Sequence, residues 1–314
     1  MPVIAFTVEP TTTAASTIAS SVPVIGGSVG PLVHDVLMLL CDTRFVALIG
    51  QLTDTHVLAR DDQETEVFVD NNARLVDAVA SIRAETTPVD VLIGTGDLAN
   101  SGHPAEYEAL LELLEPLDVP FLALGGNHDV RELLRSSFPG TPWVDAEHAS
   151  WSTVVAGVRL VGLDSTTPGE HGGRLDEERC DWLDGVLRAP FDGPTLLAMH
   201  HPPFASGIRW MDMHGFPGLD LLDEVLTAHP VDRILCGHLH RPMASTFAGA
   251  PAQVGMSTVQ HVALDLRPDA PVAVIDNPVG YQLIDVRPDS IVAHSRYIRT
   301  AAPVIPAWAS EFDQ

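Results

Sequence analysis

Five clusters of polar residues each follow a short apolar run, and their side chains are of types that bind metal ions. One histidine among the 14 in the chain means little by itself. Clusters that recur after successive runs indicate one site, because a sheet brings the ends of its strands together. Carboxylates, imidazoles and an amide oxygen suit Zn, Mn or Fe better than calcium or copper. The clusters are Asp54-x-His56, Asp97, Asn127-His128-Asp129, His200 and His238-x-His240.

Asp97 is the central member of this set. The apolar run at residues 91–93 precedes it, which is typical of a strand covered on both faces. Gly94 and Gly96 allow the backbone to turn tightly after that strand. An acidic side chain would then stand at the carboxyl edge of the sheet, where α/β proteins usually place their sites. We interpret Asp97 as a carboxylate shared by two metal ions.

The spacing within two of the clusters adds a geometric argument. Residues two apart in an extended chain project to the same side. Asp54 with His56, and His238 with His240, could therefore each bind at one site without strain. We expect both segments to be extended.

The elements that would position these clusters alternate in the first half of the chain and become strand-rich later. Strand-like runs are followed by helical patterns, and the second half adds a hairpin around Ala156-Gly157. This order predicts an α/β protein with two packed sheets flanked by helices. Helices are expected over residues 72–84, from Pro104 onward, and over 176–188 and 219–228. Strands are expected over residues 45–52, 89–93, 120–124, 151–155, 158–163, 195–199, 233–236, 252–256, 281–286 and 290–294.

The same clusters, with their flanking glycines, carry a family resemblance. In order and approximate spacing they resemble the full signature of the calcineurin-like metallophosphoesterases, over about residues 45–247. The segment Met199-His200-His201-Pro202-Pro203 is similar to the branch of bacterial class III cyclic nucleotide phosphodiesterases and glycerophosphodiesterases. The resemblance implies a four-layer α/β/β/α sandwich of two mixed β-sheets flanked by helices. The matching blocks are Asp54-x-His56, Gly96-Asp97, Gly125-Gly126-Asn127-His128-Asp129, His200 and Gly237-His238-x-His240.

The resemblance also implies a role for each residue of these blocks. Two divalent or trivalent ions of Fe, Mn or Zn would share Asp97. His128 would face the substrate and assist the leaving group, and Asp129 would orient His128 through a hydrogen bond. His201 is expected to be structural or to lie at the rim. One ion would be held by Asp54, His56, Asp97 and His240, and the other by Asp97, Asn127, His200 and His238.

Such a site implies metal-dependent hydrolysis of phosphoric esters. A water that bridges two ions roughly 3.5–4 Å apart would lose its proton easily, and the resulting hydroxide would attack phosphorus in line. We expect a phosphodiesterase for small molecules, with 3′,5′-cyclic nucleotides such as cAMP favoured. Glycerophosphodiester or phosphomonoester hydrolysis is the alternative, because the ligands are common to all these reactions. A scaffold that has lost its metals is disfavoured, since no ligand is missing.

The charge of the chain restricts its partners. The formal net charge is −25, from 42 acidic and 17 basic residues. A field of this sign disfavours nucleic acid as a partner. Anionic substrates would also be repelled unless bound cations inverted the local potential.

Cysteine content and hydropathy indicate a cytoplasmic protein. The three cysteines are too scattered for a disulfide framework and are expected to be small core side chains. Residues 1–10 lack the basic region of a secretory signal, and charged residues interrupt the apolar run at residues 32–49, so stable membrane insertion is not expected. The cysteines are Cys41, Cys180 and Cys236.

The chain is expected to hold one main domain. Residues 1–40 are interpreted as a poorly ordered arm, residues 41–300 as the metallophosphoesterase domain with a strand-rich C-terminal part, and residues 301–314 as a tail. An apolar insert would line a substrate pocket or form a subunit contact, with equal weight on each. If the insert forms a subunit contact, the protein would be a homodimer or a higher homo-oligomer. The insert comprises Trp210, Met211, Met213, His214 and Phe216.

Overall fold

The structure is a computed structural model that describes residues 47–62 and 69–298. The predicted N-terminal arm, the C-terminal tail and Cys41 lie outside these ranges. Cys180 and Cys236 are buried, reduced side chains, as expected. None of the helices in the described ranges is long and apolar enough to cross a bilayer.

Two sheets form the centre of the described part. The first is mixed and has the strand order β13-β12-β1-β2-β3, and the second has the order β4-β5-β6-β7-β9-β8. The strands of the first sheet are β1 (Ala47–Leu52), β2 (Val91–Thr95), β3 (Phe121–Leu124), β12 (Gly280–Val286) and β13 (Ile291–Tyr297). Those of the second are β4 (Trp151–Val155), β5 (Val158–Gly162), β6 (Thr195–Ala198), β7 (Arg233–Cys236), β8 (Met243–Phe247) and β9 (Ala250–Val254).

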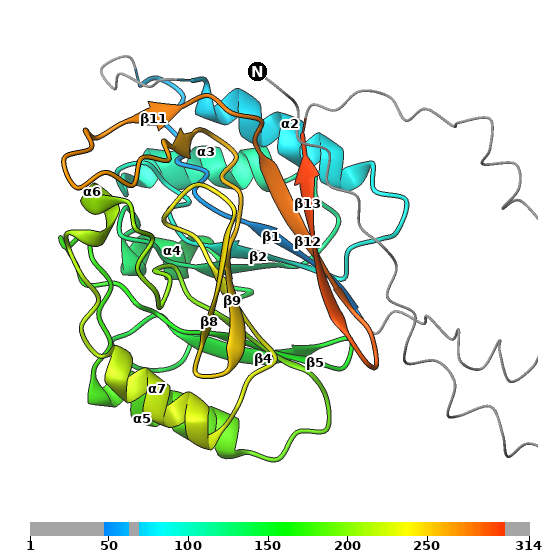
Figure 1. Cartoon of the computed structure of the whole chain (residues 1–314). Coiled ribbons are helices and arrows are strands. Elements are labelled where there is room, and N and C mark those ends of the chain that lie inside the picture. The colour runs from blue at the N-terminus through cyan, green and yellow to red at the C-terminus, as the bar shows by residue number, and fades with distance from the viewer. Residues whose placement is uncertain (1–46, 63–68, 299–314) are drawn as a thin grey trace, which may run out of the picture. The chain divides into compact units, whose positions relative to one another are not determined.

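Helices cover the outer face of each sheet (Figure 1). Side chains of α2 (Asn71–Arg83), α3 (Pro104–Leu114) and α4 (Arg131–Ser137) share one core cluster with the first sheet. Those of α5 (Glu177–Arg188) and α7 (Leu219–Ala228) share another with the second sheet. The predicted layering, helix, sheet, sheet and helix, is confirmed.

A third core cluster lies between the two sheets. It joins residues of both, among them Ile49 and Ile93 from the first sheet and Trp151 and Leu235 from the second. On β1, Leu48 packs toward the helices while its neighbour Ile49 packs toward the other sheet. This alternation explains why β1 and β2 are apolar on both faces.

Strands β1, β2 and β3 run parallel, as do β5, β6 and β7. Parallel neighbours place their carboxyl ends at one edge of a sheet. Five of these strands are followed directly by a polar cluster found in the sequence, and the segments after β2 and β3 turn through glycine. A Cβ atom on Gly126 would meet the carboxylate of Asp97, and one on Gly96 would meet the His200 ring.

Several elements were not expected from the sequence, among them the strand β8 and two very short elements. The helix α6 (Arg209–Asp212) has one turn, and β10 (His261–Val262) pairs with β11 (Val274–Ile275) as a short hairpin. Each is too short for a periodic pattern to mark it.

Candidate metal centre

The structure brings together all the polar clusters found in the sequence. The segments that carry these clusters lie at the carboxyl ends of strands in both sheets, and backbone hydrogen bonds join them to one another. Asp54 N–H donates to the Gly96 carbonyl oxygen, and His56 N–H donates to that of Asp97, each over 3.0 Å. Gly237 N–H donates to the His200 carbonyl oxygen over 2.9 Å. The site is therefore built on the ends of rigid strands.

The extended geometry expected for the D-x-H and H-x-H segments is wrong. Asp54, His56, His238 and His240 all have left-handed backbone conformations, with φ between 42° and 71°, and Asp97 has a φ of 50°. Residues other than glycine seldom adopt this region, and it is concentrated at functional sites. A hydrogen bond within the site helps to hold the backbone of His238 in this conformation. The Asp54 carboxylate accepts the backbone N–H of His238 over 2.9 Å.

The first group of converging side chains is Asp54, His56, Asp97 and His240. One donor atom from each lies within 4.8 Å of the others. The Nε2 atom of His240 is 3.5 Å from Asp54 Oδ1 and 3.0 Å from His56 Nε2. Two carboxylates and two imidazoles thus direct donor atoms at one point.

A second group lies on the other side of Asp97. His200 Nε2 is 3.2 Å from the amide oxygen of Asn127, and His238 Nδ1 is 3.1 Å from it. The same Asp97 oxygen, Oδ2, is 3.3 Å from His200 Nε2 and 3.7 Å from His56 Nε2. One carboxylate oxygen therefore faces both groups.

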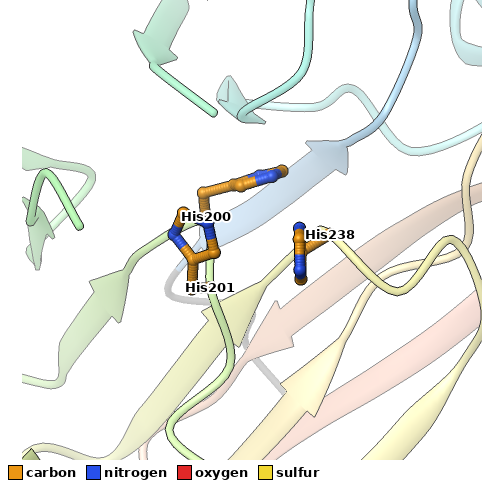
Figure 2. A group of neighbouring side chains, drawn as sticks. All are labelled: His200, His201 and His238. Atoms are coloured by element: carbon orange, nitrogen blue, oxygen red, sulfur yellow. The ribbon is translucent and has the colours of Figure 1, made fainter. Parts of the chain in front are cut away.

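The second group is adjoined by a further histidine. His200, His201 and His238 form a cluster whose rings gather beside neighbouring strand ends (Figure 2). Both ring nitrogens of His201 already have partners, however, with Nδ1 2.9 Å from Ser165 Oγ and Nε2 3.1 Å from the His171 carbonyl oxygen. This arrangement fits the structural role expected for His201.

Backbone carbonyl groups fix the orientation of two of the imidazoles. His200 Nδ1 lies 2.8 Å from the Thr95 carbonyl oxygen, and His240 Nδ1 lies 3.0 Å from that of Gln260. A carbonyl oxygen can only accept, so each Nδ1 carries a proton, and Nε2 is the ring atom that faces the carboxylates of Asp97 and Asp54. Buried imidazoles of metal sites are oriented in this way.

The electrostatics of the site also fit cations. Burial raises the pKa of Asp54. Burial also lowers the pKa of His56 and that of His238 well below the usual value for histidine. For His200, burial acts to lower the pKa, but the Asp97 charge and hydrogen bond outweigh it and raise the pKa to about 9. Among the described residues no lysine or arginine forms an ion pair with Asp54 or Asp97. Bound cations would supply the missing positive charge.

The expected hydrogen bond between Asp129 and His128 is wrong. The Asp129 carboxylate instead accepts backbone N–H groups of Gly126, Leu98 and Ala99 over 2.9–3.1 Å, and the Tyr107 hydroxyl over 3.1 Å. It therefore ties the loop after β3 to the loop after β2.

The partner that orients His128 is the backbone of Asn100, which the sequence did not reveal. His128 Nδ1 lies 2.6 Å from the Asn100 carbonyl oxygen, and the backbone N–H of His128 donates to Asp97 Oδ1 over 2.9 Å. Since Nδ1 must carry a proton to bond this carbonyl group, Nε2 is the atom left for proton transfer.

A cavity of about 640 Å³ opens over the two groups. Of the apolar insert, Trp210, Met211 and His214 line it, Phe216 and Met211 line a smaller neighbouring cavity, and Met213 lines neither. These residues therefore line cavities, and the two expected roles, substrate pocket and subunit contact, stay predictions. Several lining residues had no signal in the sequence because they lie outside any strand-end cluster. They are Asn71, Asn100, His171, Gln260, Val262 and Val274.

The fold and the two groups of candidate ligands are those of a class of dinuclear metal hydrolases. The family described as calcineurin-like phosphoesterase matches residues 47–242, and the chain belongs to this family. It is a metal-dependent phosphoric ester hydrolase, as the sequence predicted.

Relatives agree with this assignment, and a solved structure has a similar fold. A probable cyclic nucleotide phosphodiesterase of Rhodopseudomonas palustris is 36% identical over 77% of this chain and 89% of its own. A probable glycerophosphodiester phosphodiesterase GpdQ of Arcobacter nitrofigilis is 32% identical over 80% and 93%. The fold resembles a dimetal phosphatase from Danio rerio, with a TM-score of 0.61 and 16% identity over 82% of this chain and 98% of that one.

Proposed function

We propose that this protein is a dinuclear-metal phosphodiesterase for small molecules, with 3′,5′-cyclic nucleotides such as cAMP as favoured substrates. The observation that supports it most is the shared Asp97 oxygen, which lies between two groups of ligands at the floor of the cavity. The relative named as a cyclic nucleotide phosphodiesterase favours this substrate class.

Seven side chains would hold the two ions in this proposal. Asp97 would contribute to both. Bound there, the cations would supply Lewis acidity, which lowers the pKa of water and offsets charge on the phosphate oxygens. The remaining ligands are Asp54, His56 and His240 for one ion and Asn127, His200 and His238 for the other.

His128 would act on the leaving group. Its ring lies edge-on to His56 with centroids 4.7 Å apart, and it lines the cavity. The Asn100 carbonyl group holds the proton on Nδ1, so a second proton would sit on Nε2. In that doubly protonated form the ring would donate the Nε2 proton to the departing alkoxide oxygen and become the neutral imidazole. Asp129 would have a positioning role, by fixing the loop that carries Asn127 and His128.

The negative charge of the chain is compatible with this substrate class. At a net charge of −25 the protein repels free phosphodiesters. The ligand groups would hold cations at the cavity floor and attract the phosphate locally. Nucleic acid remains disfavoured, since a long polyanion would extend well beyond this positive region.

A glycerophosphodiesterase is the second candidate, because one relative bears that name. A hydrolysis panel of metal-loaded protein with cAMP, glycerophosphocholine and p-nitrophenyl esters separates the two. We expect the highest kcat/KM for cAMP. A panel in which only glycerophosphocholine is hydrolysed would transfer the proposal to the second candidate, and no hydrolysis of any ester would refute both.

A further inference from the structure

The cavity over the metal centre is larger than a phosphate group needs. Its volume of about 640 Å³ lies within the range of pockets that hold ligands the size of a nucleotide. One wall of its lining comes from Trp210 and Met211 of α6 and from Gln260, Val262 and Val274 at the β10–β11 hairpin. This wall carries an indole, a carboxamide and apolar side chains, and contains no charged group.

The helix α6 is held firmly despite its single turn. The Asp212 carboxylate accepts the backbone N–H groups of Ser206 and Gly207, each over 2.8 Å, and the Ser206 hydroxyl over 2.7 Å. Ile208 is only 1% exposed and anchors the start of the turn. Trp210 is therefore presented to the cavity from a fixed backbone.

The part of the wall at the β10–β11 hairpin is tied to the candidate metal ligands. The backbone carbonyl oxygen of Gln260 is the one that holds His240 Nδ1, at 3.0 Å. Arg241 donates to the Val262 carbonyl oxygen over 2.8 Å, which fixes the start of the hairpin. Both β11 and α6 lie on the same side of the molecule in Figure 1.

The carboxamide of Gln260 has no hydrogen-bond partner within the described ranges, although its backbone is fixed. It is partly exposed and lines the cavity. A free carboxamide and an indole that line the same cavity match the chemistry of a nucleobase. Bases stack on aromatic side chains, and a glutamine carboxamide can pair with the N6 and N7 edge of adenine.

We propose that Trp210 and Gln260 form a nucleobase subsite that takes the adenine of the substrate, with Val262 and Val274 bordering the ring. This deepens the proposed function and rests on it for the position of the phosphate. Diesters without a base, such as glycerophosphoethanolamine, would make no stacking or base-pairing contact with these residues and would bind without their contribution.

The test separates the base from the phosphate chemistry. Binding of adenosine to the full-length, metal-loaded protein is followed by ligand-observed NMR titration, with ribose as the base-free control probe. We expect Trp210→Ala to weaken adenosine binding about tenfold, within the range known for base stacking. Trp210→Phe should restore most of the affinity, and Gln260→Leu should weaken it about fivefold. Met213→Ala is the matched control, because this residue of the same segment is 64% exposed and does not line the cavity.

The same variants are assayed for hydrolysis. The ratio of kcat/KM for cAMP to that for glycerophosphoethanolamine should fall about tenfold in Trp210→Ala and stay unchanged in Met213→Ala.

Adenosine binding that is absent in the wild type, or equal in wild type, Trp210→Ala and Gln260→Leu, would overturn the subsite. If Trp210→Ala does not fold, the loss of adenosine binding in Gln260→Leu decides. Hydrolysis of diesters without adenosine binding refutes the subsite alone, and adenosine binding without any hydrolysis refutes the proposed function alone.

Discussion

At the scale of single residues, the account depends most on Asp97, whose Oδ2 atom lies 3.3 Å from His200 Nε2 and 3.7 Å from His56 Nε2. Asp54, Asp97 and His240 could be singled out because carboxylates and imidazoles recur after apolar runs. Their left-handed φ values could not, since nothing in a residue other than glycine marks that conformation. The partner of Asp129 was also unpredictable, because its carboxylate binds N–H groups supplied by a loop some 30 residues away in sequence.

Replacing the imidazole of His128 should affect proton transfer more than metal binding. His128→Ala removes the proposed donor but none of the proposed ligands, so we expect full metal content and a kcat for cAMP reduced by about 10² to 10⁴. Turnover of p-nitrophenyl esters should fall far less, because p-nitrophenolate leaves without a proton. Steady-state kinetics and metal analysis of the same preparation provide the check. An equal loss on both classes of ester would contradict the role.

At the scale of elements, the long helices and the strands that end at the site followed from the sequence, and the small elements did not. Helix α7 has the bounds that its apolar pattern predicted. Helix α6 depends on the Asp212 carboxylate instead of periodicity, and the β10–β11 hairpin has two residue pairs. Such elements exist because of tertiary contacts, which a sequence pattern does not report.

The ion pair between Arg131 and Asp164 links α4 to the segment after β5, and thus the two halves of the sandwich. Arg131 Nε lies 2.6 Å from Asp164 Oδ2, and Asp164 is 1% exposed. Arg131→Met leaves a buried carboxylate without its partner, and we expect a loss of about 3–5 kcal/mol in the free energy of unfolding, measured with urea at pH 7. Arg188→Met, in an exposed pair with Asp184, is the control and should cost less than about 1 kcal/mol.

The same pair sets a pH dependence. Burial acts to raise the pKa of Asp164, but Arg131 and several hydrogen bonds outweigh it and lower the pKa. A carboxyl group with a lowered folded-state pKa stabilises the protein above its unfolded value of about 4, and the stabilisation disappears as pH falls through the folded-state pKa. The difference between wild type and Arg131→Met should therefore shrink below about pH 4. A difference that stays constant from pH 7 to pH 3 would exclude this pair as its cause.

At the scale of the whole molecule, the family resemblance supplied what local patterns could not. Composition and periodicity led to two sheets with helices, whereas the layered order and the division of ligands between two ions came from the resemblance. The structure confirms the layers and gathers the ligand residues from both sheets. The net charge of −25 repels phosphate, and cations held by the candidate ligands would offset that repulsion at the cavity.

The most direct test is the anomalous diffraction of a crystal of the metal-loaded protein, with metal content measured on the same sample. We predict two ions per chain, about 3.5–4 Å apart, with both in contact with Asp97. Asp97→Ala should have reduced metal content and no hydrolytic activity. A single ion, two ions that share no Asp97 oxygen, or an Asp97→Ala variant with full metal and full activity would contradict the account.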